Sequence, residues 1–274
     1  MSARVRESTS ALQLVEDAAH LLRRMPVTVG ARYYTGAIVF WFSLFQLWAE
    51  MTSGAASDDA RARLALQTAL AYLWMKLWHA WFAKGLWRML DPEAAFVRPT
   101  AGNALRVAAA QAAVHASSTI LLPLAFIITL PAGWAVAFYQ SASACALLSR
   151  KEGAAMGMRE LCRTALTCSL DTPRRNHVVL LHLSLLAPVL AFSCWVGLIQ
   201  LLYLARSLLG IETLFTLSLG AIFNPTLLFT AVLLCAMMTG PLLKAVYVVR
   251  CFESISRSSG ANLFARLRAL VEAA

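Results

Sequence analysis

Lys76, His79 and Lys244 are basic side chains within apolar segments of the sequence, and their types and positions could support chemistry. Lys76 and His79 are three residues apart, so a helix would place them on one face. Lys244 lies in a separate apolar segment, and Glu212 is an isolated acidic residue before that segment. Because an ionisable side chain in an apolar segment is costly, it often lines a cavity or a proton path. We therefore expect a candidate polar pocket formed by Lys76, His79, Lys244 and Glu212.

Each of these residues can also have a purely structural role, and the sequence leaves the functional and the structural role open. Lys76 and His79 lie close to one end of their segment, where a long side chain can extend to the membrane interface. Lys244 follows Pro241, so it marks either a hinge at a gate or carboxylate site, or a kinked helix with an interfacial lysine. The isolated acidic residue can pair with Arg206 or contact a partner.

Other sequence patterns of catalysis or metal binding do not occur. The chain has no zinc-protease motif, phosphate-binding glycine loop, Gly-x-Ser-x-Gly elbow or pair of intramembrane aspartates. The five histidines are not spaced like metal ligands, and the six cysteines include no Cys-x-x-Cys pair. We expect no catalytic residue, no cofactor and no metal site, and we interpret the cysteines as small buried hydrophobic side chains.

The elements that must position these residues are membrane helices. Of the 274 residues, 59% are hydrophobic and 14% are charged, whereas about a quarter of a soluble domain is charged. The segment from Pro225 to Leu243 contains no charged residue, and about 20 such residues cross a bilayer as a helix. The net charge of +10 comes from basic residues between the apolar segments. That distribution is typical of membrane orientation and argues against a nucleic-acid partner.

The predicted fold is an all-α bundle of about six membrane-spanning helices. The membrane domain covers residues 33–250, and its expected spans are 33–49, 64–87, 107–130, 134–148, 178–203 and 225–249. Residues 107–148 are divided at Pro131, because one straight helix of that length would overshoot the bilayer about twofold. A single long, bent helix is the alternative.

Amphipathic helices are expected at both ends of the chain. Residues 1–32 and 251–274 are interpreted as cytoplasmic segments whose apolar side chains recur at helical spacing. The first segment either lies in the membrane interface or packs on the other helices. Nineteen Lys or Arg residues fall on the expected inner side and three on the outer side. This bias predicts a bacterial inner-membrane protein with both termini in the cytoplasm.

The carboxy-terminal third carries an ordered series of motifs. They are Leu208-Leu-Gly-Ile-Glu-Thr213 with Phe215, then Asn224 and Phe229, Pro241 through Phe252, and finally Ser256 with Gly260. In these motifs the chain resembles an uncharacterised family of bacterial multi-pass integral membrane proteins. The resemblance implies the multi-pass class and no particular chemistry. The chain differs from the family pattern at Gly240 and at Asn224-Pro225-Thr226, where the family has an acidic residue and an Asn-Thr-Thr run.

Three functional hypotheses follow from the sequence. The first is a non-enzymatic subunit or scaffold of a bacterial envelope assembly, because catalytic groups are scarce and the basic loops can hold a partner. The second is a transporter or permease-type subunit with a polar cavity near Lys76 and His79. The third is a membrane-embedded enzyme. The expected partners are the lipid bilayer and either a second protein or further copies of this chain.

Overall fold

The structure is a computed structural model that describes residues 10–54, 57–128, 133–149 and 153–260. These residues form helices and no β-strand, apart from one isolated bridge between Phe96 and Leu148. The elements are α1 (Ala11–Arg24), α2 (Val27–Ser53), α3 (Asp58–Leu90), α4 (Ala101–Ile128), α5 (Gly133–Cys145), α6 (Met158–Leu170), α7 (Pro173–Leu209), the short 3-10 helices η1 (Leu214–Thr216) and η2 (Leu219–Phe223), and α8 (Pro225–Ser259).

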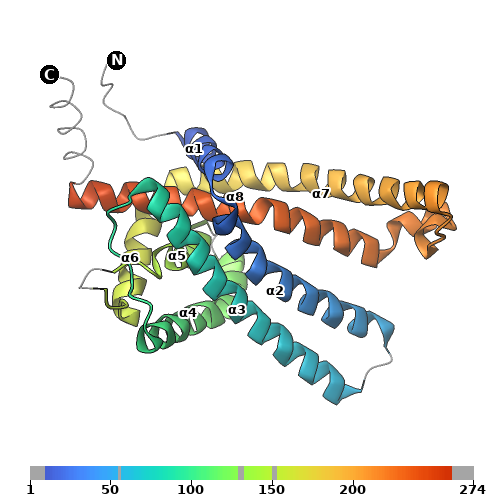
Figure 1. Cartoon of the computed structure of the whole chain (residues 1–274), viewed down its shortest axis with the longest axis horizontal. Helices are drawn as coiled ribbons and strands as arrows, with labels where there is room; N and C mark the ends of the chain where they lie inside the picture. The colour runs from blue at the N-terminus through green and yellow to red at the C-terminus, as the bar shows by residue number, and fades with distance from the viewer. Residues whose placement is uncertain (1–9, 55–56, 129–132, 150–152, 261–274) are drawn as a thin grey trace.

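Two long hairpins extend from one body of shorter helices (Figure 1). Helices α2 and α3 form one hairpin, and α7 and α8 form the other. Gly54 ends α2 and Gly210 ends α7, each with a left-handed backbone (φ +68° and +66°) that glycine adopts at little cost. Helix α8 then begins at Pro225, with the Asn224 side chain accepting a hydrogen bond of 2.9 Å from the Thr226 amide. This confirms the predicted start of the last helix.

Helix α5 lies at the centre of the body. It contacts α3, α4, α6, α7 and α8, and most of its residues are buried. Its sequence, GWAVAFYQSASAC, is rich in small residues, which allow five neighbouring helices to approach closely. The indole N–H of Trp87 on α3 donates a hydrogen bond of 2.9 Å to the Ala144 carbonyl of α5. The core of the protein is therefore assembled around a helix too short to cross a bilayer.

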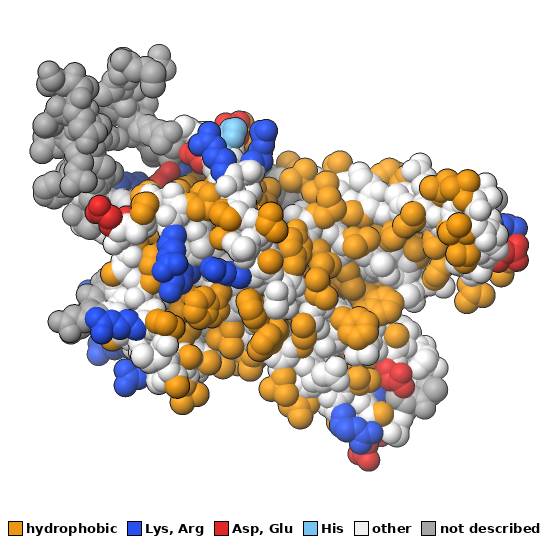
Figure 2. Space-filling model, in the orientation of Figure 1, with side chains coloured by type: hydrophobic (Ala, Val, Ile, Leu, Met, Phe, Trp, Pro, Cys, Tyr) orange, Lys and Arg blue, Asp and Glu red, His pale blue; other side chains and the backbone are white. Residues whose placement is uncertain are grey.

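In the described parts of the chain, three helices are long and apolar enough to cross a membrane: α4, α7 and α8, with mean hydropathies of 1.6, 2.1 and 2.0 over their most apolar segments. None of the residues in that segment of α7 is buried against the rest of the chain. Hydrophobic side chains cover the two hairpins, and charged ones gather at the hairpin tips and on the body (Figure 2). This distribution is compatible with a membrane location. Helices α2 and α3 contain the first two expected spans, but neither has a segment that is both as apolar and as poor in charged residues as this requires.

The helices differ in their bounds from the expected spans. The span predicted at 134–148 is the 13-residue helix α5, which is about 20 Å long and shorter than a hydrocarbon core of about 30 Å. Helix α2 begins before residue 33, and α8 continues beyond residue 251 to Ser259. Both helices are longer than the expected spans, because a helix continues until a capping residue ends it.

The division of residues 107–148 is confirmed as two helices. The hydroxyl groups of Ser117 and Tyr139 are 3.0 Å apart, and Ala125 packs near Ala135, so α4 and α5 run antiparallel. The break predicted at Pro131 lies outside the described residues, as does the amphipathic helix predicted in the tail after residue 260.

At the other end of the chain, α1 packs against α7 and α8 through Leu14 and Ala18, which are fully buried. Of the two roles left open for the amino-terminal segment, packing on the bundle therefore applies to α1.

Candidate functional site: a buried basic cluster

The structure brings three of the four predicted pocket residues together. Lys76 and Lys244 both lie close enough to His79 to interact with it electrostatically, and His115 from α4 joins them. We call Lys76, His79, His115 and Lys244 the basic cluster. It is formed by side chains of α3, α4 and α8, which are far apart in the sequence. His79, His115 and Lys244 are 4%, 1% and 5% exposed, and Lys76 is half-buried.

Polar atoms of the basic cluster lack hydrogen-bond partners in the protein. The ammonium of Lys244 makes no hydrogen bond, and neither ring nitrogen of His79 makes one. His115 places Nε2 2.9 Å from the Ser143 hydroxyl, but its Nδ1 has no partner. A buried polar group without a partner costs free energy, and a buried charge without one costs far more. A ligand that accepts hydrogen bonds would remove this cost.

Within the part of the chain that the structure describes, no carboxylate is among the charged groups that act on the basic cluster. Glu212, the fourth predicted pocket residue, lies instead at the far tip of the α7–α8 hairpin. There its carboxylate is 3.2 Å from the Arg206 guanidinium, and its side chain is 61% exposed. The predicted pairing with Arg206 is thus confirmed, and Glu212 does not belong to the pocket. The basic cluster carries potential positive charge from four side chains without a compensating acid.

Aromatic and hydroxyl side chains line the basic cluster. The ring of Tyr33 on α2 stacks on His79, with centroids 4.4 Å apart and planes 8° from parallel. The Lys76 ammonium lies over the Tyr72 ring, 4.7 Å from its centroid, and the Tyr72 hydroxyl is 3.2 Å from that of Ser118. Hydroxyl groups donate hydrogen bonds to anions, so this environment suits a small anionic group.

Sequence reasoning missed His115, although a signal was present. Gln111, His115 and Ser118 are spaced i, i+4 and i+7 along α4, so they form one polar stripe on an otherwise apolar helix. All three are almost fully buried. Polar stripes on membrane helices face the bundle interior, and this one could have pointed to the same pocket.

A second polar centre holds the helices of the body together. Arg250 on α8 is 1% exposed, and its guanidinium donates to the Asn176 side-chain oxygen at 2.5 Å and to the carbonyls of Ser169 at 3.1 Å and Asp171 at 2.5 Å. The Tyr247 hydroxyl donates to the same Asn176 oxygen at 2.7 Å. The Asn176 amide in turn donates to the Gly133 carbonyl of α5. We call this the Arg250 network, and its contacts are structural.

Three cysteines meet beside the Arg250 network. Cys145 ends α5, Cys168 lies on α6 and Cys251 lies on α8, and their sulfur atoms are all within 4.8 Å of one another. Each is at most 1% exposed, and none forms a disulfide. The pKa of the Cys168 thiol is lowered because Cys145 and Cys251 donate hydrogen bonds to its sulfur, with smaller contributions from Ser254 and the Arg250 charge.

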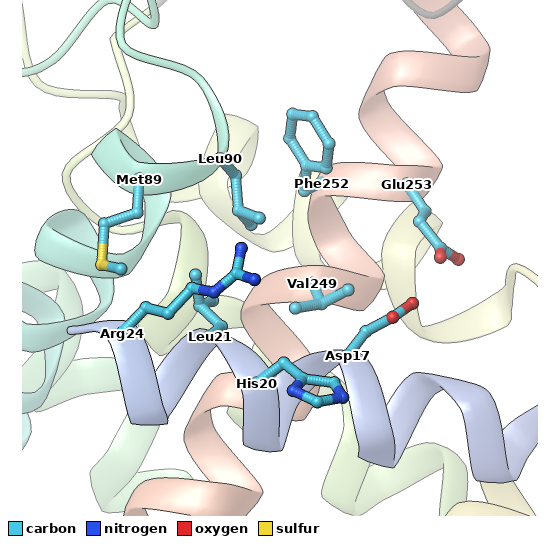
Figure 3. A pocket seen from close by; sticks show the side chains of 9 residues that line it. All are labelled: Asp17, His20, Leu21, Arg24, Met89, Leu90, Val249, Phe252 and Glu253. Carbon is cyan, nitrogen blue, oxygen red and sulfur yellow. The ribbon is translucent and has the colours of Figure 1, made fainter.

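A groove of about 380 Å³ opens elsewhere, between α1, the end of α3 and α8 (Figure 3). It shares no residue with the basic cluster. Apolar side chains line it together with two acidic and two basic ones, and its residues are Asp17, His20, Leu21, Arg24, Met89, Leu90, Val249, Phe252 and Glu253. Charges of both signs around an apolar floor define no single class of ligand.

No family model, curated protein or solved structure matches the chain. The family resemblance in the carboxy-terminal third therefore stays a prediction. The motif residues nevertheless have structural roles here. Arg250 and Tyr247 form the Arg250 network, and Lys244 belongs to the basic cluster. Functional conclusions rest on this geometry alone.

Proposed function

We propose that the protein is a multi-pass protein of the bacterial cytoplasmic membrane that binds a small oxyanion in the basic cluster and moves it across the bilayer, as a transporter or permease-type subunit. The observation that carries the proposal is the buried Lys244 ammonium, which has neither a hydrogen-bond partner nor a neighbouring carboxylate among the residues that the structure describes. A carboxylate or phosphate group would supply both the missing charge and the missing acceptors.

The proposed topology has three helical hairpins, α2–α3, α4–α5 and α7–α8, each entering and leaving on the cytoplasmic side. This gives six passes and keeps both termini inside, in agreement with the distribution of Lys and Arg. The short α5 fits this arrangement because other helices surround it. A helix buried in protein need not span the hydrocarbon by itself.

A hinge beside the basic cluster supports movement of the ligand. Pro241 lies within α8, one helical turn before Lys244, and removes one backbone hydrogen bond from the helix. The preceding Gly240 lies against the Tyr33 hydroxyl, and the Tyr33 ring stacks on His79. Bending α8 at this point would change the position of Lys244 relative to His79, and so open or close the site.

Binding and transport are favoured over catalysis because the charged groups that act on His79 and His115 are all basic, which suits capture of an anion. A second candidate function is a non-enzymatic subunit of an envelope assembly. It is favoured by α7, whose most apolar segment has no residue buried within the chain and so is free to pack against a membrane partner or a second copy. Affinity purification in mild detergent, with identification of the co-purifying proteins, tests that function.

Flux measurements test the transport proposal. Purified full-length chain is reconstituted into liposomes, and uptake of radiolabelled inorganic phosphate and acetate is followed against unlabelled anion inside. We expect exchange above protein-free vesicles for at least one anion, and its loss in Lys244→Met. Lys84→Met is the matched control, because the Lys84 ammonium has its own partners, the Trp81 and Phe96 rings at 5.2 Å. Flux of neither anion, or equal flux in both variants, contradicts the proposal.

A further inference from the structure

The three cysteine sulfurs are arranged like one face of a metal coordination sphere. Each thiol comes from a different helix, α5, α6 or α8, yet all three sulfur atoms lie within 4.8 Å of one another. A zinc–sulfur bond is about 2.3 Å long, so two sulfurs of one tetrahedral site stand about 3.8 Å apart. Small side-chain rotations would bring Cys145, Cys168 and Cys251 to that separation. A single buried cysteine commonly serves as a small hydrophobic side chain, but three sulfurs that converge from three helices are typical of metal ligands.

The neighbouring charge matches a metal thiolate. Arg250 is 1% exposed, and all its hydrogen bonds go to uncharged acceptors. Among the described residues no carboxylate hydrogen-bonds to Arg250; the Asp171 carboxylate acts on it only electrostatically and pairs with Arg257 at 2.8 Å. Three thiolates around a divalent ion carry one net negative charge, which one guanidinium neutralises. A monovalent ion would leave a negative charge in the buried site, at a cost in free energy.

We propose that Cys145, Cys168 and Cys251 bind one thiophilic divalent metal ion, Zn²⁺ by preference, which joins α5, α6 and α8. Binding releases three thiol protons and forms three metal–sulfur bonds, with no change of oxidation state. The fourth position is open to an oxygen ligand, and the hydroxyls of Ser141 and Ser254 flank Cys251 and Cys168. The role is structural, and it is independent of what the basic cluster binds.

Metal analysis of the whole protein tests the site. The full-length chain is purified in mild detergent with a reductant, incubated with Zn²⁺, freed of excess metal and analysed by plasma mass spectrometry. We expect about one Zn²⁺ per chain, with sulfur-to-metal charge-transfer absorption after replacement by Co²⁺. Cys168→Ser should lose both signals. Cys162→Ser is the matched control, because Cys162 lies on the same helix outside the cysteine cluster.

The metal content of the wild-type protein is sufficient to test the proposal, so the test does not depend on whether a variant folds. No retained Zn²⁺ and no charge-transfer band would overturn it, as would a disulfide between two of the three cysteines that persists after purification with the reductant. Equal metal content in the Cys168→Ser and Cys162→Ser variants would also overturn it, because the metal would then be bound elsewhere. Retention of Cu⁺ in preference to Zn²⁺ would overturn the charge argument and the assignment of a divalent ion.

Discussion

The aromatic ring of Tyr33 stacks almost parallel on the imidazole of His79, with centroids 4.4 Å apart. This contact joins α2 to α3 at the basic cluster, and the Tyr33 hydroxyl reaches the backbone of α8 at Gly240. Helices α2, α3 and α8 therefore meet at Tyr33 and His79. Lys76 and Lys244 approach His79 at the same place. The geometry of the cluster depends on this close approach of α8.

The first prediction concerns Gly240. A Cβ atom at this position would overlap the Tyr33 hydroxyl, so Gly240→Ala should destabilise the protein by about 1–3 kcal/mol through overpacking. Removing the hydroxyl with Tyr33→Phe in the same chain should restore part of that loss, because the two changes share one contact. Thermal unfolding in detergent measures both effects. The control is Gly197→Ala, because a Cβ atom at Gly197 would meet no atom within 4 Å beyond its own helical turn. Additive effects of the two changes would contradict the described contact.

The second prediction concerns Lys244 in the absence of ligand. Its buried ammonium has no partner, so replacing it with an apolar side chain of similar length should stabilise the protein by about 1–3 kcal/mol. Lys244→Met should therefore raise the melting temperature in anion-free buffer and remove any further rise on adding phosphate or acetate. Lys84→Met, which gives up two ring contacts, should show no such rise. A lower melting temperature for Lys244→Met would indicate that the lysine already has a stabilising partner.

The third prediction concerns the Arg250 network. Asn176 accepts hydrogen bonds from both Arg250 and Tyr247, so Asn176→Ala leaves two buried donors without that acceptor. We expect a loss of about 2–4 kcal/mol in unfolding free energy. Gln67→Ala, at an exposed amide, should change stability by less than about 0.5 kcal/mol. Chemical denaturation in mixed micelles compares the two variants. Equal losses of unfolding free energy would show that the Arg250 network does not stabilise the protein.

The fourth prediction concerns topology. Thr52 and Ser218 lie at the tips of the two long hairpins, and Ser258 lies near the opposite end of α8, where α1 packs. Cysteines introduced at the two tips should react with a membrane-impermeant maleimide added to intact cells, and Ser258→Cys should react only after lysis. Peptide mass spectrometry assigns each label to its site. Labelling of Ser258→Cys in intact cells would reverse the proposed orientation.

Much of the helical organisation could be predicted from the sequence. The start of the last helix at Pro225 and the two helices within residues 107–148 follow from local signals, namely the beginning of an uncharged apolar segment and a proline-glycine break. Helix lengths were harder to predict. Among the described residues, three helices are long and apolar enough to cross a membrane. Helices α2, α3 and α5 lie partly against protein and need not be as apolar as helices that face lipid.

The candidate site was predictable only in part. Lys76 and His79 share a helical face, so local spacing was enough to group them. The addition of Lys244 and His115 required knowing which faces of α8 and α4 turn toward α3, and sequence periodicity does not give the rotation of packed helices. The meeting of Cys145, Cys168 and Cys251 could not be predicted for the same reason, although Cys145 and Cys251 lie near the ends of expected spans. Glu212 was misplaced because its partner, Arg206, holds it at the hairpin tip.

Equilibrium dialysis of radiolabelled phosphate and acetate against the full-length protein in detergent tests the central claim most directly. Lys76, His79 and Lys244 are predicted to form one oxyanion site, so wild-type protein should bind one of the two anions saturably, and Lys244→Met should weaken that binding at least about tenfold. Lys84→Met should bind as the wild type does. Saturable binding that is unchanged in Lys244→Met, or no binding of either anion to folded wild-type protein, would contradict the account.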